Sequence, residues 1–271
     1  MSFGKAILVA LLFCSFCHAQ KFRFTPLSES TILQREQNAP TNQHDREARI
    51  KVLFLQAGCA NQLGEQQLEK LPGANVICRL SGSSDETIIV GATYTQLAPD
   101  NWTGASLLPS LFQTLVRRKR HHTFIFVAFD DSGGDLAGAQ FFAAHMTAED
   151  VERTEAMVNL DPLGFSPTKI SSTSSDKKLV EAFISVVYAL KGMASQVDVD
   201  KGIHVDSAPF ASLHIPQITI HSLTQEAVAD LQNGEKDPAE FRARHYYNSY
   251  RLLSGYLAYL DEVLKPRRSE R

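Results

Sequence analysis

Apolar positions along the chain follow two patterns, helical spacing and short continuous runs. Residues 45–56, 103–116, 134–145, 176–190 and 241–264 have apolar residues every three or four positions, which predicts helices. Apolar runs typical of buried strands occupy 75–80, 87–92, 122–129, 157–160 and 217–221. Helices and strands that alternate in this order predict a three-layer α/β/α sandwich around a mostly parallel mixed sheet.

The segment between the first two predicted strands, Ser81-Gly82-Ser83-Ser84, is short and consists of turn-forming residues. This composition predicts a hairpin between 75–80 and 87–92. In a parallel sheet, binding and catalytic sites form at the carboxyl ends of the strands. Residues that directly follow the predicted strands are therefore the first candidates for a site.

The N-terminal part of the chain is expected to precede the folded domain. Residues 1–19 combine Lys5, an apolar core over 6–13 and the small-x-small sequence Cys17-His18-Ala19, which is typical of a cleaved signal peptide. A single membrane anchor is the alternative, although the apolar stretch is short for one. Residues 20–43 are polar and predict an extended lead-in, and 44–267 form one domain. Cleavage predicts a secreted or periplasmic protein with no membrane span after signal removal.

Composition excludes some classes of partner. The chain has 44% hydrophobic and 21% charged residues, with 27 Lys+Arg against 30 Asp+Glu, so it is neither disordered nor a basic nucleic-acid binder. One basic run, 117–120, is followed by His121 and His122. We interpret it as a solvated turn, with a polyanion patch as the alternative.

Two cysteines remain after the signal peptide, Cys59 and Cys78. In an oxidising compartment they could form a disulfide, and two buried thiols are the alternative. Neither cysteine has the histidine and acidic neighbours of a catalytic or metal-binding thiol.

Several motifs match a known family in order and content. They include 75–78, 89–92, the D-N-W-T-G-A stretch 100–105, the M-V-N-L-D stretch 157–161, and 215–222. These stretches resemble the secreted zinc aminopeptidases, the group that includes bacterial leucyl aminopeptidase, aminopeptidase Y and glutaminyl cyclase. The resemblance implies the sandwich fold and a site where two neighbouring zinc ions are held by five ligands beside a glutamate general base.

This chain departs from the family pattern at most of those positions. Matched to the motifs, the five ligand positions and the base position fall on Thr93, Asp100, Gly133, Asp161 and Gln232, and on Ser132. Only the two aspartates keep a usable ligand group, and Asp100 could instead simply cap the following helix. A serine cannot replace a glutamate base, because its hydroxyl is not a base near neutral pH.

We therefore expect a non-catalytic pseudo-peptidase that needs no cofactor and binds a peptide or protein in a vestigial cleft edged by Asn101 and Trp102. The alternative is a zinc-dependent aminopeptidase that uses replaced ligands such as Asp130, Asp131 or His221. A third hypothesis is a serine hydrolase with Ser132 as nucleophile, because Asp131-Ser132-Gly133-Gly134 resembles the nucleophile segment of chymotrypsin-like proteases. The order of the residues and the α/β pattern argue against it.

Overall fold

A mixed sheet forms the centre of the computed structural model, which describes residues 24–69, 71–95, 101–171, 173–199, 205–233 and 240–264. Within these ranges eight strands follow the order β1-β2-β4-β3-β5-β8-β6-β7. They are β1 (Leu63–Gln67), β2 (Ala74–Leu80), β3 (Thr87–Thr93), β4 (Thr123–Phe129), β5 (Thr154–Leu160), β6 (Lys169–Ser171), β7 (Ser195–Gln196) and β8 (Gln217–His221). The four central strands β4, β3, β5 and β8 are parallel, so their carboxyl ends share one edge of the sheet.

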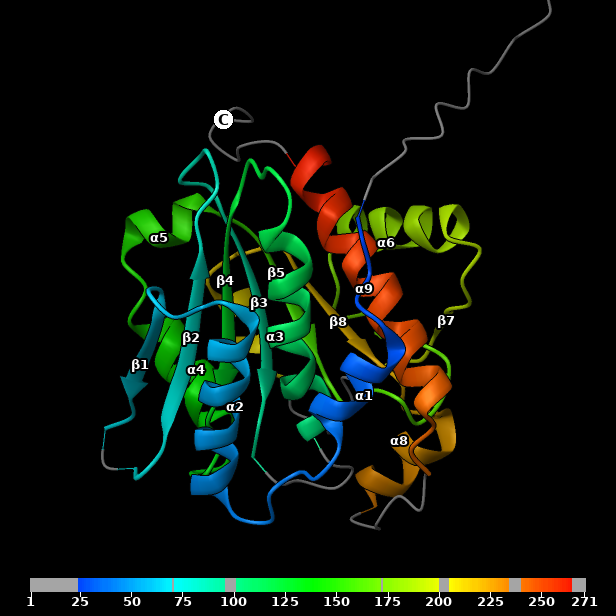
Figure 1. Ribbon diagram of the computed structural model, residues 1–271, viewed down its shortest axis with the longest axis horizontal. Coiled ribbons are helices and arrows are strands. Elements are labelled where there is room, and N and C mark those ends of the chain that lie inside the picture. Colours follow the sequence, from blue (N-terminus) through cyan, green and yellow to red (C-terminus); the bar gives the residue numbers. More distant parts are fainter. Residues whose placement is uncertain are drawn as a thin grey trace, which may run out of the picture.

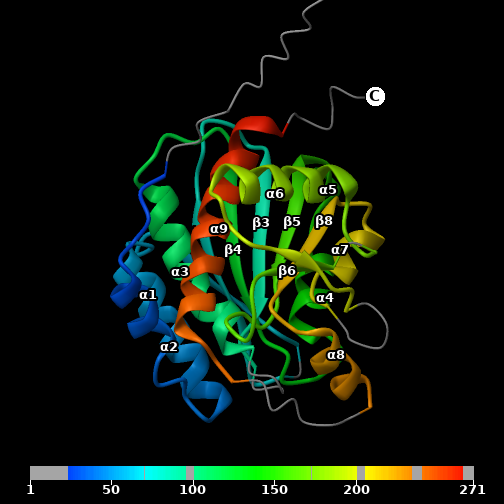
Figure 2. The same ribbon diagram turned by 90° about the vertical axis from the view of Figure 1, so that its right-hand side faces the viewer.

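Helices cover both faces of this sheet (Figures 1 and 2). One face carries α1 (Glu29–Glu36), α2 (Gln43–Ala57), α3 (Trp102–Val116), α6 (Lys177–Ala189) and α9 (Ala243–Val263). The other carries α4 (Ala137–Ala144), α5 (Ala148–Arg153) and α7 (Ala208–Ser212), and α8 (Gln225–Gln232) packs in a smaller cluster of its own. The predicted three-layer α/β/α sandwich is confirmed.

Strand β4 shows why its sequence forms a central strand. Phe124 and Phe126 pack into the core beneath α3 and α9, whereas Val127 and Phe129 pack into the core beneath α4 and α7. Because successive side chains of a strand point to opposite faces, a strand covered on both faces has apolar residues at every position.

The predicted hairpin between 75–80 and 87–92 is wrong. Both segments are strands, but β2 pairs antiparallel with β4 and β3 pairs parallel with β4, so β4 lies between them. Helix α3 lies between β3 and β4 in the chain. It leads back along one face of the sheet, so that β4 begins beside the start of β3 and pairs with it in parallel. Local turn composition therefore did not decide which strands pair.

The predicted extended lead-in over 20–43 is also wrong in part, since α1 forms within it. Ser28 caps this helix by accepting a hydrogen bond from the Thr31 amide, and Ile32 is buried against the main core. Arg35 donates to Ser110 Oγ over 3.0 Å. The segment belongs to the folded body, because the buried apolar residues Leu27 and Ile32 and a few long-range hydrogen bonds dock it on α3 and α9.

Cys59 and Cys78 are joined by a disulfide that ties the end of α2 to β2. The predicted signal peptide at 1–19 lies outside the described residues. Among the helices of the described part of the chain, none has the length and apolar content needed to cross a bilayer.

Candidate functional site

The carboxyl edge of β3, β4 and β5 gathers several of the residues that the sequence singles out. Thr93 ends β3, Asp130 and Asp131 follow β4, and Asp161 follows β5. A further carboxyl, Asp206, enters from the segment before α7 and accepts a hydrogen bond of 3.0 Å from Thr93 Oγ1. We name Thr93, Asp131, Asp161 and Asp206 the acidic edge.

Two carboxyls of the acidic edge are held in surroundings that disfavour their charge. Burial raises the pKa of Asp206 to about 8, and the nearby charge of Asp161 adds to the increase. Burial likewise raises the pKa of Asp161 to about 7, opposed by a hydrogen bond from Asn159. Among the described residues no lysine or arginine forms an ion pair with either group. At neutral pH Asp206 is therefore mostly protonated and Asp161 partly protonated, and neither carboxyl has a countercharge among the described side chains.

Asn159 adds an unused acceptor at this place. Its amide Nδ2 donates to Asp161 Oδ1 over 3.0 Å, and its Oδ1 is buried and has no hydrogen-bond partner within the described chain. Buried polar atoms are nearly always paired, so an unpaired oxygen beside two partly neutral carboxyls points to a missing donor.

Asp130, Asp131 and Ser132 stabilise the turn after β4. Asp130 is fully buried and accepts hydrogen bonds from Gln43 Nε2, from the Ser132 amide at 3.1 Å and from Ser132 Oγ at 2.8 Å. Asp131 Oδ1 accepts from the Ala137 amide over 2.8 Å and so caps α4, while burial raises its pKa. The Ser132 hydroxyl therefore donates to a carboxylate and meets no imidazole among the described residues, which argues against the serine-hydrolase hypothesis.

Gly133 stands where the resemblance places a metal ligand, and the tip of the Leu71 side chain lies close to the position that a side chain would take there. A Cβ at Gly133 would lie 2.8 Å from Leu71 Cδ1 and 3.3 Å from Ala137 Cβ. A longer side chain would have to displace Leu71 first. Among the described residues of this turn, we find no side chain that takes the place of the glutamate ligand which the resemblance implies at Gly133.

Of the other predicted residues, those that the structure describes do not join the acidic edge. Asp100 lies outside the described residues, Gln232 is exposed at the end of α8, and Asn101 begins α3 without a side-chain cap. Trp102 does not line a cleft. Its ring is 1% exposed, its Nε1 donates to the Glu36 carbonyl over 2.9 Å, and the Arg46 guanidinium covers it. The indole is a core side chain because α1 and α2 pack over it.

His221, the histidine considered as a replacement metal ligand, uses both ring nitrogens in hydrogen bonds to the backbone. Its Nε2 donates to the Val197 carbonyl over 2.8 Å, and its Nδ1 accepts from the Leu223 amide over 3.1 Å. Burial lowers its pKa to about 4, so the ring is neutral at physiological pH. With both nitrogens engaged, it has no lone pair left for a metal.

These groups do not fit the two-zinc centre that the resemblance implies. The described acidic edge offers carboxylates and hydroxyls but no imidazole, one oxygen of Asp131 caps a helix, and Thr93 donates to Asp206. Zinc sites of this kind combine imidazole with carboxylate ligands. We therefore derive no catalytic step through zinc at this edge.

Sequence reasoning missed Asp206. It lies outside any periodic pattern, just before Ser207 and the short helix α7, and a single acidic residue in a loop gives no signal by itself. The one available hint is its place in an otherwise apolar stretch ahead of a helix with proline in its first turn.

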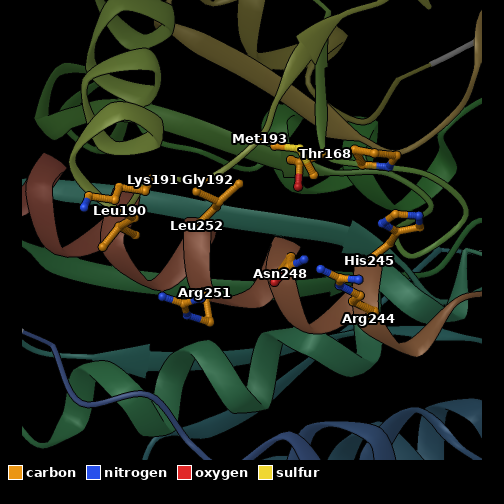
Figure 3. Close-up of a pocket in the computed structure, with 11 residues that line it drawn as sticks. Thr168, Leu190, Lys191, Gly192, Met193, Arg244, His245, Asn248, Arg251 and Leu252 are labelled. Carbon is orange, nitrogen blue, oxygen red and sulfur yellow. The ribbon is translucent and has the colours of Figure 1, made fainter.

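A separate pocket of about 270 Å³ lies beside α9 and the end of α6 (Figure 3). Its polar lining is mainly basic, with Lys191, Arg244 and Arg251 around Asn248. The pocket does not include any residue of the acidic edge, so the two places differ in both location and charge.

Comparisons with known proteins agree with the fold. No protein-family model and no curated protein sequence matches the chain. Among solved structures, a zinc aminopeptidase of Bacillus subtilis is similar with a TM-score of 0.60 and 16% identity, over 72% of this chain and 51% of that one. Our chain thus spans about half the length of that enzyme.

Two other solved structures are similar over more of their own length. The LapA aminopeptidase of Legionella pneumophila has a TM-score of 0.70 and 13% identity, covering 87% of this chain and 71% of that one. A glutaminyl cyclase of an Acidobacteriales bacterium has a TM-score of 0.67 and 15% identity, covering 88% and 97%. At these identities the likeness establishes the fold, which is that of the zinc aminopeptidases and glutaminyl cyclases.

Proposed function

We propose that this chain is an exported, non-hydrolytic protein that binds peptides by their free amino end on an aminopeptidase-like fold. The observation that carries the proposal is the pair Asp161 and Asp206, two carboxyls with raised pKa values and no cationic partner among the described residues. A bound ammonium group would supply the missing countercharge and let both carboxyls ionise.

The chemistry of the edge matches an α-ammonium group. Such a group has three N–H donors, and Asp161, Asp206 and the unpaired Asn159 Oδ1 provide acceptors of the matching kind. The peptide chain beyond the amino end would extend away from the edge, and the residues described there do not supply a base or a metal for hydrolysis.

Export is part of the same proposal. A disulfide between Cys59 and Cys78 is typical of proteins outside the reducing cytosol, which agrees with a cleaved leader and a secreted or periplasmic location. Mass spectrometry of chain expressed with its leader should give a mature protein that begins near Gln20. A full-length product in the cytosolic fraction would contradict this part.

The binding test uses a random hexapeptide library in two forms, one with free amino ends and one N-acetylated. Immobilised protein should enrich free-amine peptides at pH 7, and Asp206→Asn should abolish the preference. Asp135→Asn is the matched control, because Asp135 is exposed and lies outside the acidic edge. Equal recovery of the two forms by wild-type protein would overturn the proposal.

The enzyme alternative is tested on the same library. The similar solved structures include zinc aminopeptidases, so the library is incubated with wild-type protein and ZnCl₂ and assayed for free amino acids. We expect no release above a blank. Release that a chelator stops and that Asp161→Asn abolishes would establish an aminopeptidase and end the pseudo-peptidase proposal.

A further inference from the structure

A second cluster of polar side chains lies at the opposite edge of the sheet, away from the acidic edge. Glu86 directly precedes β3, and His121 and His122 directly precede β4. These strands are parallel, with Thr87 opposite Thr123. The residues just before them are therefore neighbours, although they are far apart in the sequence.

The three side chains are close enough to share one ion. One ligand atom from each of Glu86, His121 and His122 lies within 4.8 Å of the others, and His121 Nε2 is 3.2 Å from Glu86 Oε2. Ligands on a tetrahedral zinc ion are ~3.4 Å apart, given bonds of about 2.0–2.1 Å. The 3.2 Å separation of His121 and Glu86 is close to this spacing, and His121 is half-exposed, so its ring has room to adjust.

His122 gives independent support, because it is fully buried and only partly satisfied. Its Nδ1 lies 3.3 Å from Asp261 Oδ1, while its Nε2 has no hydrogen-bond partner within the described chain. A buried imidazole nitrogen without a partner calls for an explanation. A histidine whose one nitrogen faces a carboxylate while the other is unoccupied has the arrangement of a metal ligand oriented by a neighbouring acid.

The backbone holds this cluster in place. The Ser84 amide donates to the His121 carbonyl over 2.9 Å, and the Thr123 amide donates to the Glu86 carbonyl over 2.8 Å. Gly82 lies so close to this stretch that a Cβ on it would be 2.3 Å from the His121 and His122 carbonyl oxygens. The segment 81–86 is therefore fixed against the start of β4 and presents Glu86 to His121.

The basic side chains nearby bond to oxygen atoms outside the cluster of Glu86, His121 and His122. Arg118 pairs with Glu262 at 3.0 Å and lies 3.9 Å from Asp261, and Arg120 donates to the carbonyls of Leu115, Arg118 and Ser81. Each guanidinium is thus turned toward oxygen partners of its own.

We propose that Glu86, His121 and His122 bind one borderline divalent cation, with Zn²⁺ as the reference ion, and that Asp261 positions the His122 ring. Two imidazoles and one carboxylate leave a fourth position for water, a ligand set that suits Zn²⁺ and related transition metals. The family resemblance predicts no ligands here, and the proposal does not depend on peptide binding at the acidic edge.

The test titrates the full mature chain, stripped with a chelator and dialysed, with ZnCl₂ by calorimetry and with CoCl₂ by visible absorption. Wild-type protein should bind one ion per chain and give the intense Co²⁺ bands of a four-coordinate site. His121→Ala and Glu86→Gln, both at solvent-accessible positions, should lose stoichiometric binding. Asp261→Asn should weaken it about 10- to 100-fold.

Two matched controls decide the location of the ion. His145→Ala removes an exposed histidine elsewhere, and Asp161→Asn alters the acidic edge, so both variants should bind like wild type. Melting temperatures measured without metal check that all variants fold. The proposal fails if wild-type protein binds no ion, if His121→Ala and Glu86→Gln bind as tightly as wild type, or if Asp161→Asn removes the ion.

Discussion

Replacing Asp206 by asparagine should make the protein more stable at high pH. The pKa of Asp206 is raised from 3.8 to about 8 in the folded chain, mainly by burial. Between these values the folded state holds a proton that the unfolded state has released. The free energy of unfolding therefore falls as pH rises through this window, and the stabilisation is fully present only below the unfolded pKa.

The size of the effect follows from the same two pKa values. One pKa unit corresponds to about 1.4 kcal/mol, so Asp206 alone should lower the free energy of unfolding of wild-type protein by about 4 kcal/mol between pH 5 and pH 9. The smaller increase in the pKa of Asp161 adds to this decline. Asparagine keeps the shape and can still accept the hydrogen bond from Thr93, but it carries no charge. Asp206→Asn should remove most of the decline and exceed wild type by about 4 kcal/mol at pH 9.

Urea unfolding at the two pH values measures this, with the single, buried Trp102 as the fluorescent reporter. The experiment is run without reductant, so that the disulfide is intact in both states. Asp135→Asn is the control and should follow the wild-type pH dependence. A wild-type stability that is equal at both pH values, or a decline just as steep in Asp206→Asn, would refute the reasoning.

Three further predictions concern stability. The Cys59–Cys78 disulfide spans 19 residues, so Cys59→Ala with Cys78→Ala should lower the free energy of unfolding by about 3 kcal/mol in urea, whereas an unchanged midpoint would mean that the cross-link does not constrain the unfolded chain. Asp176 caps α6 through the amides of Lys178 and Leu179, so Asp176→Ala should cost about 1 kcal/mol in the same assay and Asp176→Ser far less. Gly82→Ala should cost about 1–3 kcal/mol through its clash with the start of β4 and should weaken Zn²⁺ binding as well, and a fully stable variant would contradict the close approach.

The elements predicted correctly are those whose own sequence shows which of their residues are buried. Helix α3 has apolar residues at helical spacing, and strand β4 has them in a continuous run, as expected for elements packed in the core. Asp176 is the N-cap of α6 and marks where that helix begins. Strand β1, Leu63–Gln67, was missed because it is an edge strand with mostly polar residues, and backbone pairing with β2 holds it in place.

The site was less accessible to sequence reasoning, for a physical reason. Motif matching locates positions along the chain, but the use of each side chain depends on its neighbours in space. Trp102 follows a motif residue and yet is covered by α1, whereas Asp206 belongs to no periodic element and yet meets Thr93. The pairing of His122 with Asp261 joins the start of a strand to the end of α9, which no local pattern reveals.

The contacts around Gly133 and Thr93 bear on whether a zinc site could be engineered into this fold. A Cβ at Gly133 would lie 2.8 Å from Leu71 Cδ1, and Thr93 donates its hydroxyl to Asp206. A glutamate at Gly133 would require the Leu71 side chain to shift, and a histidine at Thr93 would remove the hydrogen bond to Asp206. Building a zinc site on this scaffold would therefore require coordinated substitutions, in which Leu71 and Asp206 are changed together with the introduced ligands.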